Sequence, residues 1–263
     1  MNLYREDMYT GGWFSFNSTK EDWKSFYAQK MYQTFFNTYY YTLAFGAPLV
    51  NEELLITKNL QPNSLLNKKV LVIGGGPSSK ELTEQVFDSY DVTISCNHFY
   101  KNSFFKNKKV TIALLGDEVD LNDKELLDYI NLNDPIIGFE HSSTRSHVLL
   151  KEFVEGHDKT FLYLTRYFSR LGYVARGCVL ARLLGSEEID FIGMDGFSNN
   201  YHFFEQKKSP PPFDNKEMFT GQAEIFFRYM LQDLKTEKFY NLGEESPHSI
   251  YNGLLEEVKN EGY

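Results

Sequence analysis

The segment most suggestive of chemistry is a glycine-rich turn, Gly74-Gly75-Gly76-Pro77-Ser78, which follows the apolar run Lys69–Ile73. Glycines let a backbone turn sharply and let a ligand approach it closely. Ser78 and Glu81 have the spacing of a capping box, so we expect a helix whose N–H groups and positive dipole end face the turn. Such an end suits a phosphate or another anion. A tight strand–helix turn without any ligand would use the same glycines, and both interpretations stay open.

This turn differs from the two common phosphate-binding motifs. It lacks the Gly-Lys-Ser/Thr end of a P-loop. Pro77 and Ser78 also occupy positions that the dinucleotide-binding fingerprint gives to other residues. If a phosphate binds at this turn, the motif alone does not indicate which nucleotide carries it.

Polar side chains follow two further apolar runs. Asn97 comes directly after Val92–Cys96, and its amide could contact a base or a ribose, or it could simply form a turn. Asp117 comes after Val110–Leu115. It could bind a ribose hydroxyl or Mg²⁺, or it could only cap the next helix.

A histidine and an arginine are the candidate catalytic residues. His202 lies in the expected loop Asn199–Lys216, beyond an apolar run that ends in Gly193-Met194-Asp195. A lone histidine in a loop is commonly a surface residue, but a place beyond a central strand makes His202 the leading candidate for a general base. Arg176 stands near the start of a helix at the same edge, where it could neutralise a phosphate or could be a solvated helix residue.

The elements that must position these residues alternate between strands and helices, which predicts a Rossmann-like α/β fold. We expect a mostly parallel sheet with helices on both faces, and ligands beyond the carboxyl ends of its strands. The predicted strands are Lys69–Ile73, Val92–Cys96, Val110–Leu115, Pro135–Phe139, Phe161–Thr165, Ile189–Gly193 and Phe239–Leu242. The predicted helices are Ser79–Tyr90, Asp123–Asn131, His147–Val154, Tyr173–Leu184, Gly221–Lys235 and Ile250–Lys259.

Residues 1–67 are expected to form an N-terminal helical extension to a nucleotide-binding catalytic domain of residues 68–263. Aromatic residues recur near helical spacing over Lys20–Leu43, and Gly46 and Pro48 end this pattern. We expect the helix to pack on the main domain. A cap, a dimer arm and a lid on the acceptor side remain alternatives.

Composition excludes several classes of function. Of the 263 residues, 42% are apolar, which is enough for a packed core and argues against a disordered chain. The net charge is −9 and no cluster of lysine and arginine stands out, which argues against binding to nucleic acid or an anionic membrane. We expect no signal peptide, and no apolar run is long enough to span a bilayer.

The two cysteines, Cys96 and Cys178, lie in segments expected to form the core. Their positions match neither a metal site nor a disulfide framework, so we expect buried free thiols. Free thiols fit a reducing compartment, and we expect a cytoplasmic protein without a metal.

Taken in order, these segments resemble the bacterial sialyltransferases of the Campylobacter type, glycosyltransferase family 42. The likeness extends over about residues 68–242. It is carried by Gly74–Ser78, Cys96-Asn97-His98-Phe99-Tyr100, the lysine-rich Lys106–Lys109, Leu183-Leu184-Gly185 and Gly193-Met194-Asp195.

The resemblance implies a variant of the GT-A fold, often a tetramer, with a role in surface polysaccharide biosynthesis. It implies transfer of a nonulosonic acid from a CMP-activated nucleotide sugar to a carbohydrate acceptor, without a metal or other cofactor. On this hypothesis His202, or failing that Asp214 or Glu217, takes the acceptor's proton, and Arg176 offsets charge on the departing CMP. The nucleotide-binding residues would be Gly74, Gly75, Gly76, Pro77, Ser78, Asn97, Asp117 and Asp195.

The chain departs from the family pattern at four places. An asparagine in the glycine turn is replaced by Gly75, and a further nucleotide-binding asparagine by Asp117. A tyrosine that serves the departing phosphate falls near Phe197. The family's catalytic histidine lies in a loop that corresponds to Phe213–Thr220, which contains no histidine.

Two other hypotheses stay open. The same glycine turn, with Gly193-Met194-Asp195 followed by Tyr201-His202, also resembles the flagellin-modifying Maf proteins and the archaeal pterin pyrophosphokinases. The kinases use ATP and Mg²⁺, and the metal would then be bound by Asp117 and Asp195. The third possibility is a nucleotide-binding module without catalytic activity.

Overall fold

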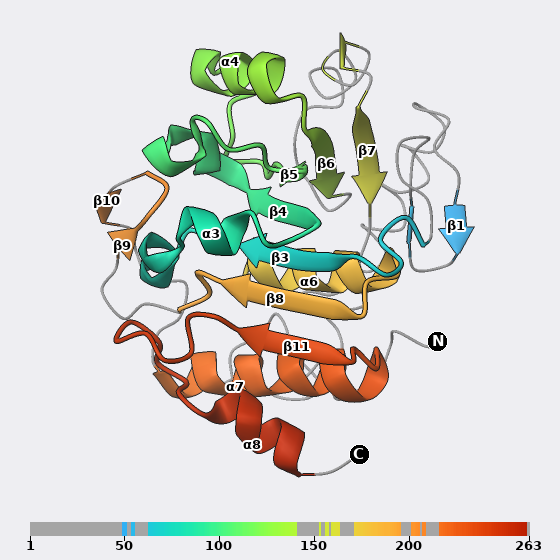
Figure 1. Cartoon of the computed structure of the whole chain (residues 1–263), viewed down its shortest axis with the longest axis vertical. Helices are drawn as coiled ribbons and strands as arrows, with labels where there is room; N and C mark the ends of the chain where they lie inside the picture. Colours follow the sequence, from blue (N-terminus) through green and yellow to red (C-terminus); the bar gives the residue numbers. More distant parts are fainter. Residues whose placement is uncertain are drawn as a thin grey trace, which may run out of the picture.

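The computed structural model describes residues 49–51, 54–55, 63–140, 153, 156–157, 159–163, 171–195, 201–205, 207–208 and 216–261. Seven strands form one sheet in the order β11-β8-β3-β4-β5-β6-β7, and all of its pairings are parallel (Figure 1). The strands are β3 (Lys69–Ile73), β4 (Val92–Cys96), β5 (Ile112–Leu114), β6 (Ile136–Glu140), β7 (Thr160–Tyr163), β8 (Glu188–Ile192) and β11 (Lys238–Asn241). The predicted α/β fold is confirmed.

The order of the strands creates a switch point beside β3. The chain adds β4 to β7 one after another on one side of β3, and then returns to place β8 and β11 on its other side. At such a reversal, the crevice outside the carboxyl ends of the strands is where open α/β sheets bind ligands. The glycine turn follows β3 and Gly193 follows β8, so both lie at this switch point.

Helices pack on the sheet. They are α3 (Glu84–Phe87), α4 (Lys124–Asn133), α6 (Tyr173–Leu183), α7 (Lys216–Arg228) and α8 (Leu254–Asn260), with short 3₁₀ helices η1 (Pro77–Glu81), η2 (Asn97–Lys101) and η3 (Ser103–Phe105). Figure 1 shows α3 in front of the sheet and α6 behind it. A Cβ on Gly177 of α6 would lie 2.9 Å from a methyl group of Val72, so a glycine is needed where this helix crosses β3.

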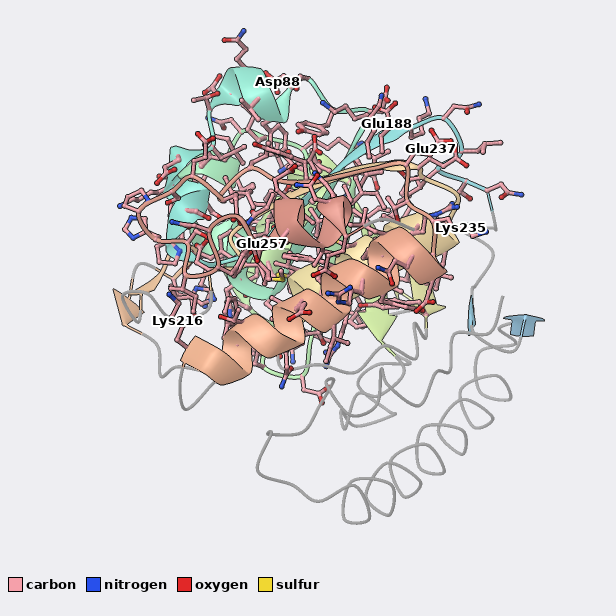
Figure 2. The ribbon with its side chains drawn as sticks, turned by 90° about the horizontal axis from the view of Figure 1, so that it is seen from below. Asp88, Glu188, Lys216, Lys235, Glu237 and Glu257 are labelled. Carbon is pink, nitrogen blue, oxygen red and sulfur yellow. The ribbon has the colours of Figure 1, made fainter. Side chains whose placement is uncertain are left out.

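Aromatic packing attaches α7 to β8 and β11. The ring of Phe191 lies 5.0–6.3 Å, between ring centroids, from those of Phe226, Phe227 and Phe239. In Figure 2, α7 runs beneath the sheet from Lys216, with α8 beside it. A π-helical turn, η4 (Tyr229–Asp233), continues α7.

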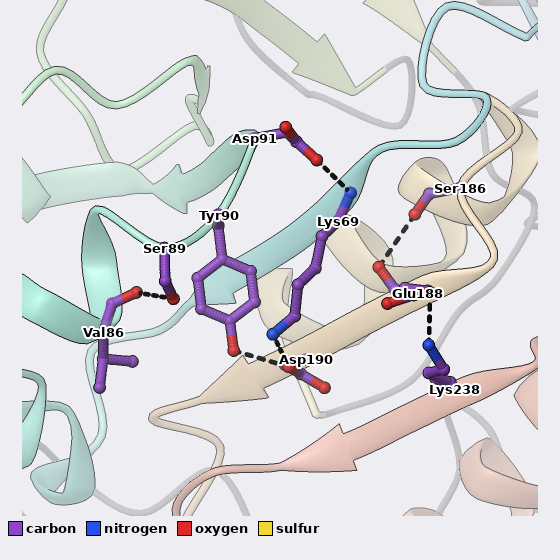
Figure 3. Close-up of polar contacts among 9 residues, drawn as sticks. All are labelled: Lys69, Val86, Ser89, Tyr90, Asp91, Ser186, Glu188, Asp190 and Lys238. Carbon is purple, nitrogen blue, oxygen red and sulfur yellow. Dashed lines mark hydrogen bonds and ion pairs between the residues drawn. The ribbon is translucent and has the colours of Figure 1, made fainter.

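At the amino ends of the strands, polar contacts connect β3 to β8 (Figure 3). The Tyr90 hydroxyl donates to Asp190 Oδ2 at 2.6 Å, and Lys69 Nζ lies 3.5 Å from the same oxygen. Burial, together with this hydrogen bond, raises the pKa of Tyr90 above its usual value. These side chains hold the end of the sheet opposite to the glycine turn.

Several predicted helices differ from those observed. The single helix expected over Ser79–Tyr90 is instead η1 followed by α3, which Thr83 caps by accepting from the Val86 N–H. The helix expected from Gly221 begins at Lys216, and the one expected from Ile250 begins at Leu254. The predicted helix Lys20–Leu43 lies outside the described residues, as does His147–Val154 apart from Phe153.

Among the described residues, two antiparallel pairs lie outside the main sheet: β1 (Leu49–Asn51) with β2 (Leu54–Leu55), and β9 (Tyr201–His202) with β10 (Lys207–Lys208). The second pair falls within Asn199–Lys216, for which the sequence predicts a loop. Within the described part of the chain, no helix has both the length and the apolar character needed to cross a membrane.

Candidate functional site

The glycine turn after β3 is hydrogen-bonded directly to the end of β8. The Gly74 N–H donates to the Ile192 carbonyl at 2.8 Å, and the Gly76 N–H donates to the Gly193 carbonyl at 3.0 Å. A Cβ on either Gly74 or Gly76 would lie 2.6 Å from the Gly193 carbonyl oxygen, which is too close for any side chain. These two glycines are therefore required by packing within the protein itself.

The side chains of Ser78 and Ser79 reinforce this junction. The Ser78 N–H donates to Asp195 Oδ2 at 2.7 Å, and Ser78 Oγ accepts from the Gly193 N–H at 3.1 Å. The Ser79 hydroxyl donates to the Gly74 carbonyl at 2.6 Å. Both serines thus hold the turn against the end of β8.

The predicted capping box is wrong, because Ser78 bonds to the residues after β8 and not to its own helix. Gly76, not Ser78, is the N-cap of η1, and no side chain caps this helix. Glu81 accepts a hydrogen bond from the Ser246 hydroxyl at 2.8 Å instead of returning to the turn. A helix as short as η1 contributes little dipole, so an anion at this turn would depend on individual backbone N–H groups.

Asp195 lies just past β8, as predicted, and is only 2% exposed. One carboxylate oxygen accepts from Ser78, while Oδ1 has no hydrogen-bond partner among the described residues. Burial raises the pKa of this carboxyl above its ordinary value, opposed by the Ser78 hydrogen bonds and by the nearby His248. The observed role of Asp195 is to hold the glycine turn.

Gly75 differs from its neighbours, because no acceptor for its N–H occurs among the described residues. Its carbonyl accepts from the Phe203 N–H at 2.7 Å. A Cβ at Gly75 would lie 2.6 Å from both Cε1 and Nε2 of His202. The imidazole of the leading catalytic candidate therefore lies directly on Gly75, beside this backbone donor.

Contacts on both sides anchor the hairpin that carries His202. The Phe203 carbonyl accepts from Asn102 Nδ2 at 2.9 Å. Phe204 is 1% exposed, and its ring centroid lies 5.6 Å from that of Phe105 and 5.7 Å from that of His202. Burial of Phe204 thus fixes the imidazole at the carboxyl edge of the sheet.

The carboxylate of Glu205 lies between two histidines. Oε1 is 3.7 Å from His98 Nδ1, and Oε2 is 3.7 Å from His202 Nδ1. We refer to His98, His202 and Glu205 as the histidine cluster. Sequence reasoning missed His98 and Glu205 as members of the site. His98 lies in Cys96-Asn97-His98-Phe99-Tyr100, a segment that carries the family resemblance, but the sequence predicts a loop where the hairpin brings Glu205 to it.

Asn97 connects the ends of β4 and β5. Its φ of 52° places it in the left-handed region, where asparagine is one of the better tolerated residues. Oδ1 accepts from the Gly116 N–H at 2.9 Å, and Nδ2 donates to the carboxylate of Glu118. Asp117 and Glu118 are both exposed in this turn. The predicted amide is therefore engaged within the protein, next to two exposed carboxylates.

Arg176 stands in the first turn of α6 and is only 9% exposed, so its interpretation as a solvated helix residue is wrong. Its guanidinium carbon lies 5.2 Å from the centre of the Tyr173 ring. A Cβ at Gly116 would lie 2.5 Å from the Tyr173 hydroxyl, so the start of α6 lies against the end of β5. This buried positive charge belongs to the same edge of the sheet as Asn97.

The predicted site residues form two groups along one edge. The glycine turn, Asp195 and the histidine cluster lie at the ends of β8, β3 and β4, whereas Asp117 and Arg176 lie beside the end of β5. β5 and β8 are separated by β3 and β4, which corresponds to roughly 14 Å. One Mg²⁺ bound by both Asp117 and Asp195 does not fit this separation, since its ligands lie at about 2 Å. Among the described residues, no three His, Cys, Asp or Glu side chains come together as a metal site.

No protein-family model matches the chain, and no curated protein sequence matches it.

Proposed function

We propose that this protein is a glycosyltransferase that transfers a nonulosonic acid from a CMP-activated donor to a hydroxyl group of a glycan acceptor. The observation that supports this most is the Gly75 N–H beside the imidazole of His202, at the carboxyl end of β3. A phosphate oxygen bound there would occupy the position at which open α/β sheets hold nucleotides. The choice of CMP rests on the ordered resemblance to glycosyltransferase family 42.

The second group of residues would hold the rest of the nucleotide. Asp117 and Glu118 are exposed carboxylates that can accept hydrogen bonds from ribose hydroxyls or a base amino group. Asn97 holds Glu118 in place through its amide. Arg176 supplies a buried positive charge beside the end of β5, which would offset the negative charge of the phosphate.

In the proposed reaction, the bond between the anomeric carbon and the phosphate oxygen breaks, and its electron pair stays with CMP. The acceptor oxygen forms the new bond to the anomeric carbon and releases its proton. Donor and acceptor thus give CMP, a glycoside and one proton. The histidine cluster lies beside the phosphate position and contains the types of side chain that transfer protons near neutral pH.

Calorimetric titration tests this proposal. We expect CMP to bind in the presence of EDTA, and cytidine to bind at least about tenfold more weakly, since a hydrogen bond to a charged phosphate contributes about 1.5–3 kcal/mol. Binding of ATP only with Mg²⁺, and no response to CMP, would replace this proposal with the pyrophosphokinase hypothesis. CMP binding without any hydrolysis of a CMP-sugar above background would indicate a binding module instead.

A further inference from the structure

A buried hydroxyl group, that of Tyr251, connects the segment after β11 to the end of β8. Tyr251 belongs to residues 242–253, which join β11 to α8, and it is 3% exposed. Its hydroxyl donates to the Met194 carbonyl at 2.7 Å and accepts from Asn241 Nδ2 at 2.9 Å. Because buried polar groups are costly to leave unpaired, this hydroxyl fixes the position of the Met194 carbonyl.

The Met194 carbonyl is directly connected to the residues that hold the glycine turn. It belongs to the planar peptide group that joins Met194 to Asp195. Asp195 Oδ2 accepts from the Ser78 N–H at 2.7 Å, and Ser78 Oγ accepts from the Gly193 N–H at 3.1 Å. A shift of this carbonyl would therefore move the carboxylate that holds Ser78.

The segment after β11 also contacts the helical turn η1 itself. A Cβ on Gly243 would lie 2.6 Å from Ser78 Oγ, so the backbone of Gly243 lies against this serine. The Ser246 hydroxyl donates to Glu81, the last residue of η1, at 2.8 Å. Asn241 Oδ1 accepts from the Gly243 N–H at 3.0 Å, so the asparagine that binds the tyrosine hydroxyl also holds this glycine. The segment thus supports the glycine turn at several points.

We propose that residues 242–253 position the glycine turn, and that Tyr251 is the positioning residue through which they hold the end of β8. The consequence for nucleotide binding rests on the function proposed above. Tyr251 touches no ligand in this role, because it is buried and acts through Asp195 and Ser78. Its place in the sequence does not suggest the role, since it lies ten residues beyond Asn241, the last residue of β11.

Tyr251→Phe removes the hydroxyl and keeps the ring, which stacks on Phe219 at a centroid distance of 5.1 Å. In ¹H–¹⁵N spectra of the ligand-free variant, we expect the amide resonances of Ser78 and Gly75 to move, because the hydrogen bond from Ser78 to Asp195 changes in length. Calorimetry should show CMP binding weakened by about fivefold, which is the equivalent of one ordinary hydrogen bond.

Tyr129→Phe is the matched control. Tyr129 is 5% exposed, and its hydroxyl likewise makes two hydrogen bonds, from the Val110 N–H and to the Lys108 carbonyl, both at 2.9 Å. These partners precede β5, at the end of the sheet opposite to the glycine turn. Tyr129→Phe should lower the melting temperature by a similar amount, and it should leave the Ser78 resonance and the CMP affinity unchanged.

Gly243→Ala tests the same segment if Tyr251→Phe does not fold. Position 243 has no positive φ, so the added methyl group acts mainly through its overlap with Ser78 Oγ. We expect it to move the resonances of Ser78 and Gly75 and to weaken CMP binding. Unmoved resonances in the folded Gly243→Ala variant would overturn the positioning role of the segment.

The ligand-free spectra keep this inference separate from the identity of the nucleotide. If the wild type fails to bind CMP, the proposed function fails. Movement of the Ser78 resonance in Tyr251→Phe, but not in Tyr129→Phe, would then still support the positioning role. Unmoved Ser78 and Gly75 resonances in folded Tyr251→Phe would overturn it, and so would an unchanged CMP affinity when the wild type binds CMP.

Discussion

Replacing Gly193 by alanine should lower the free energy of unfolding by about 2–5 kcal/mol, the sum of backbone strain and overpacking. Gly193 has a φ of 81°, which an alanine adopts only with strain. Its Cβ would also overlap Ser79 Oγ and lie 2.5 Å from the Gly74 carbonyl oxygen. Those two atoms share the hydrogen bond that holds the glycine turn, so neither can move without breaking it.

Gly253→Ala is the matched control for this variant. Gly253 has the same φ of 81°, but no atom lies within 4 Å of its Cβ position. Its replacement should cost only the backbone strain, about 1–2 kcal/mol. Urea denaturation of both variants measures the difference, and equal losses would show that the junction between the turn and β8 is not tightly packed.

Phe204→Ala should have a second large effect, a loss of about 3–5 kcal/mol in the free energy of unfolding, as is usual for a buried aromatic ring. The ring is 1% exposed and packs on Phe105 and on His202. Its removal should also weaken CMP binding, because His202 would no longer be held on Gly75. Calorimetry on the folded protein measures this second effect.

Phe226→Ala is the control that distinguishes a loss of stability from a loss of CMP binding in Phe204→Ala. Phe226 is a fully buried residue of α7 that packs on Phe191 of β8 and Phe239 of β11, outside the candidate site. Its loss should cost similar stability and leave CMP affinity unchanged. Phe204→Leu, which leaves a smaller cavity, gives a milder version of the test if the alanine variant does not fold. Unchanged CMP affinity in both Phe204 variants would show that the hairpin does not position the ligand-binding group.

The strands could be predicted because their signal is local. β3 and β4 have the predicted bounds. Val70–Ile73 is the uninterrupted apolar run typical of a strand buried on both faces, and in β4 the apolar Val92, Ile94 and Cys96 alternate with Thr93 and Ser95. The helix expected after the glycine turn could not be predicted correctly. Ser78 and Glu81 match a capping pattern, but Ser78 Oγ accepts from the Gly193 N–H and Glu81 accepts from the Ser246 hydroxyl. Both partners lie far away in the sequence.

In the candidate site, too, local sequence patterns locate some residues, whereas contacts between distant segments could not be predicted. Asn97 directly follows β4 and Asp195 lies three residues past the end of β8, so both lie at the carboxyl edge of strands that sequence periodicity can locate. The contact of Glu205 with His98 depends on the short β9–β10 hairpin, whose strands have two residues each. Lys207-Lys208 has no apolar alternation that would predict a strand, so nothing local indicated that the hairpin would fold onto the glycine turn.

The most direct test of nucleotide binding at the carboxyl edge of the sheet is an NMR titration with CMP that records the chemical shift of the Gly75 backbone amide. Because its N–H donates to no described acceptor, its resonance should move strongly and in a saturable manner when a phosphate oxygen binds. The amides of Gly74 and Gly76, which donate to Ile192 and Gly193, should move much less. A Gly75 resonance that stays in place at saturating CMP would contradict phosphate binding at this turn.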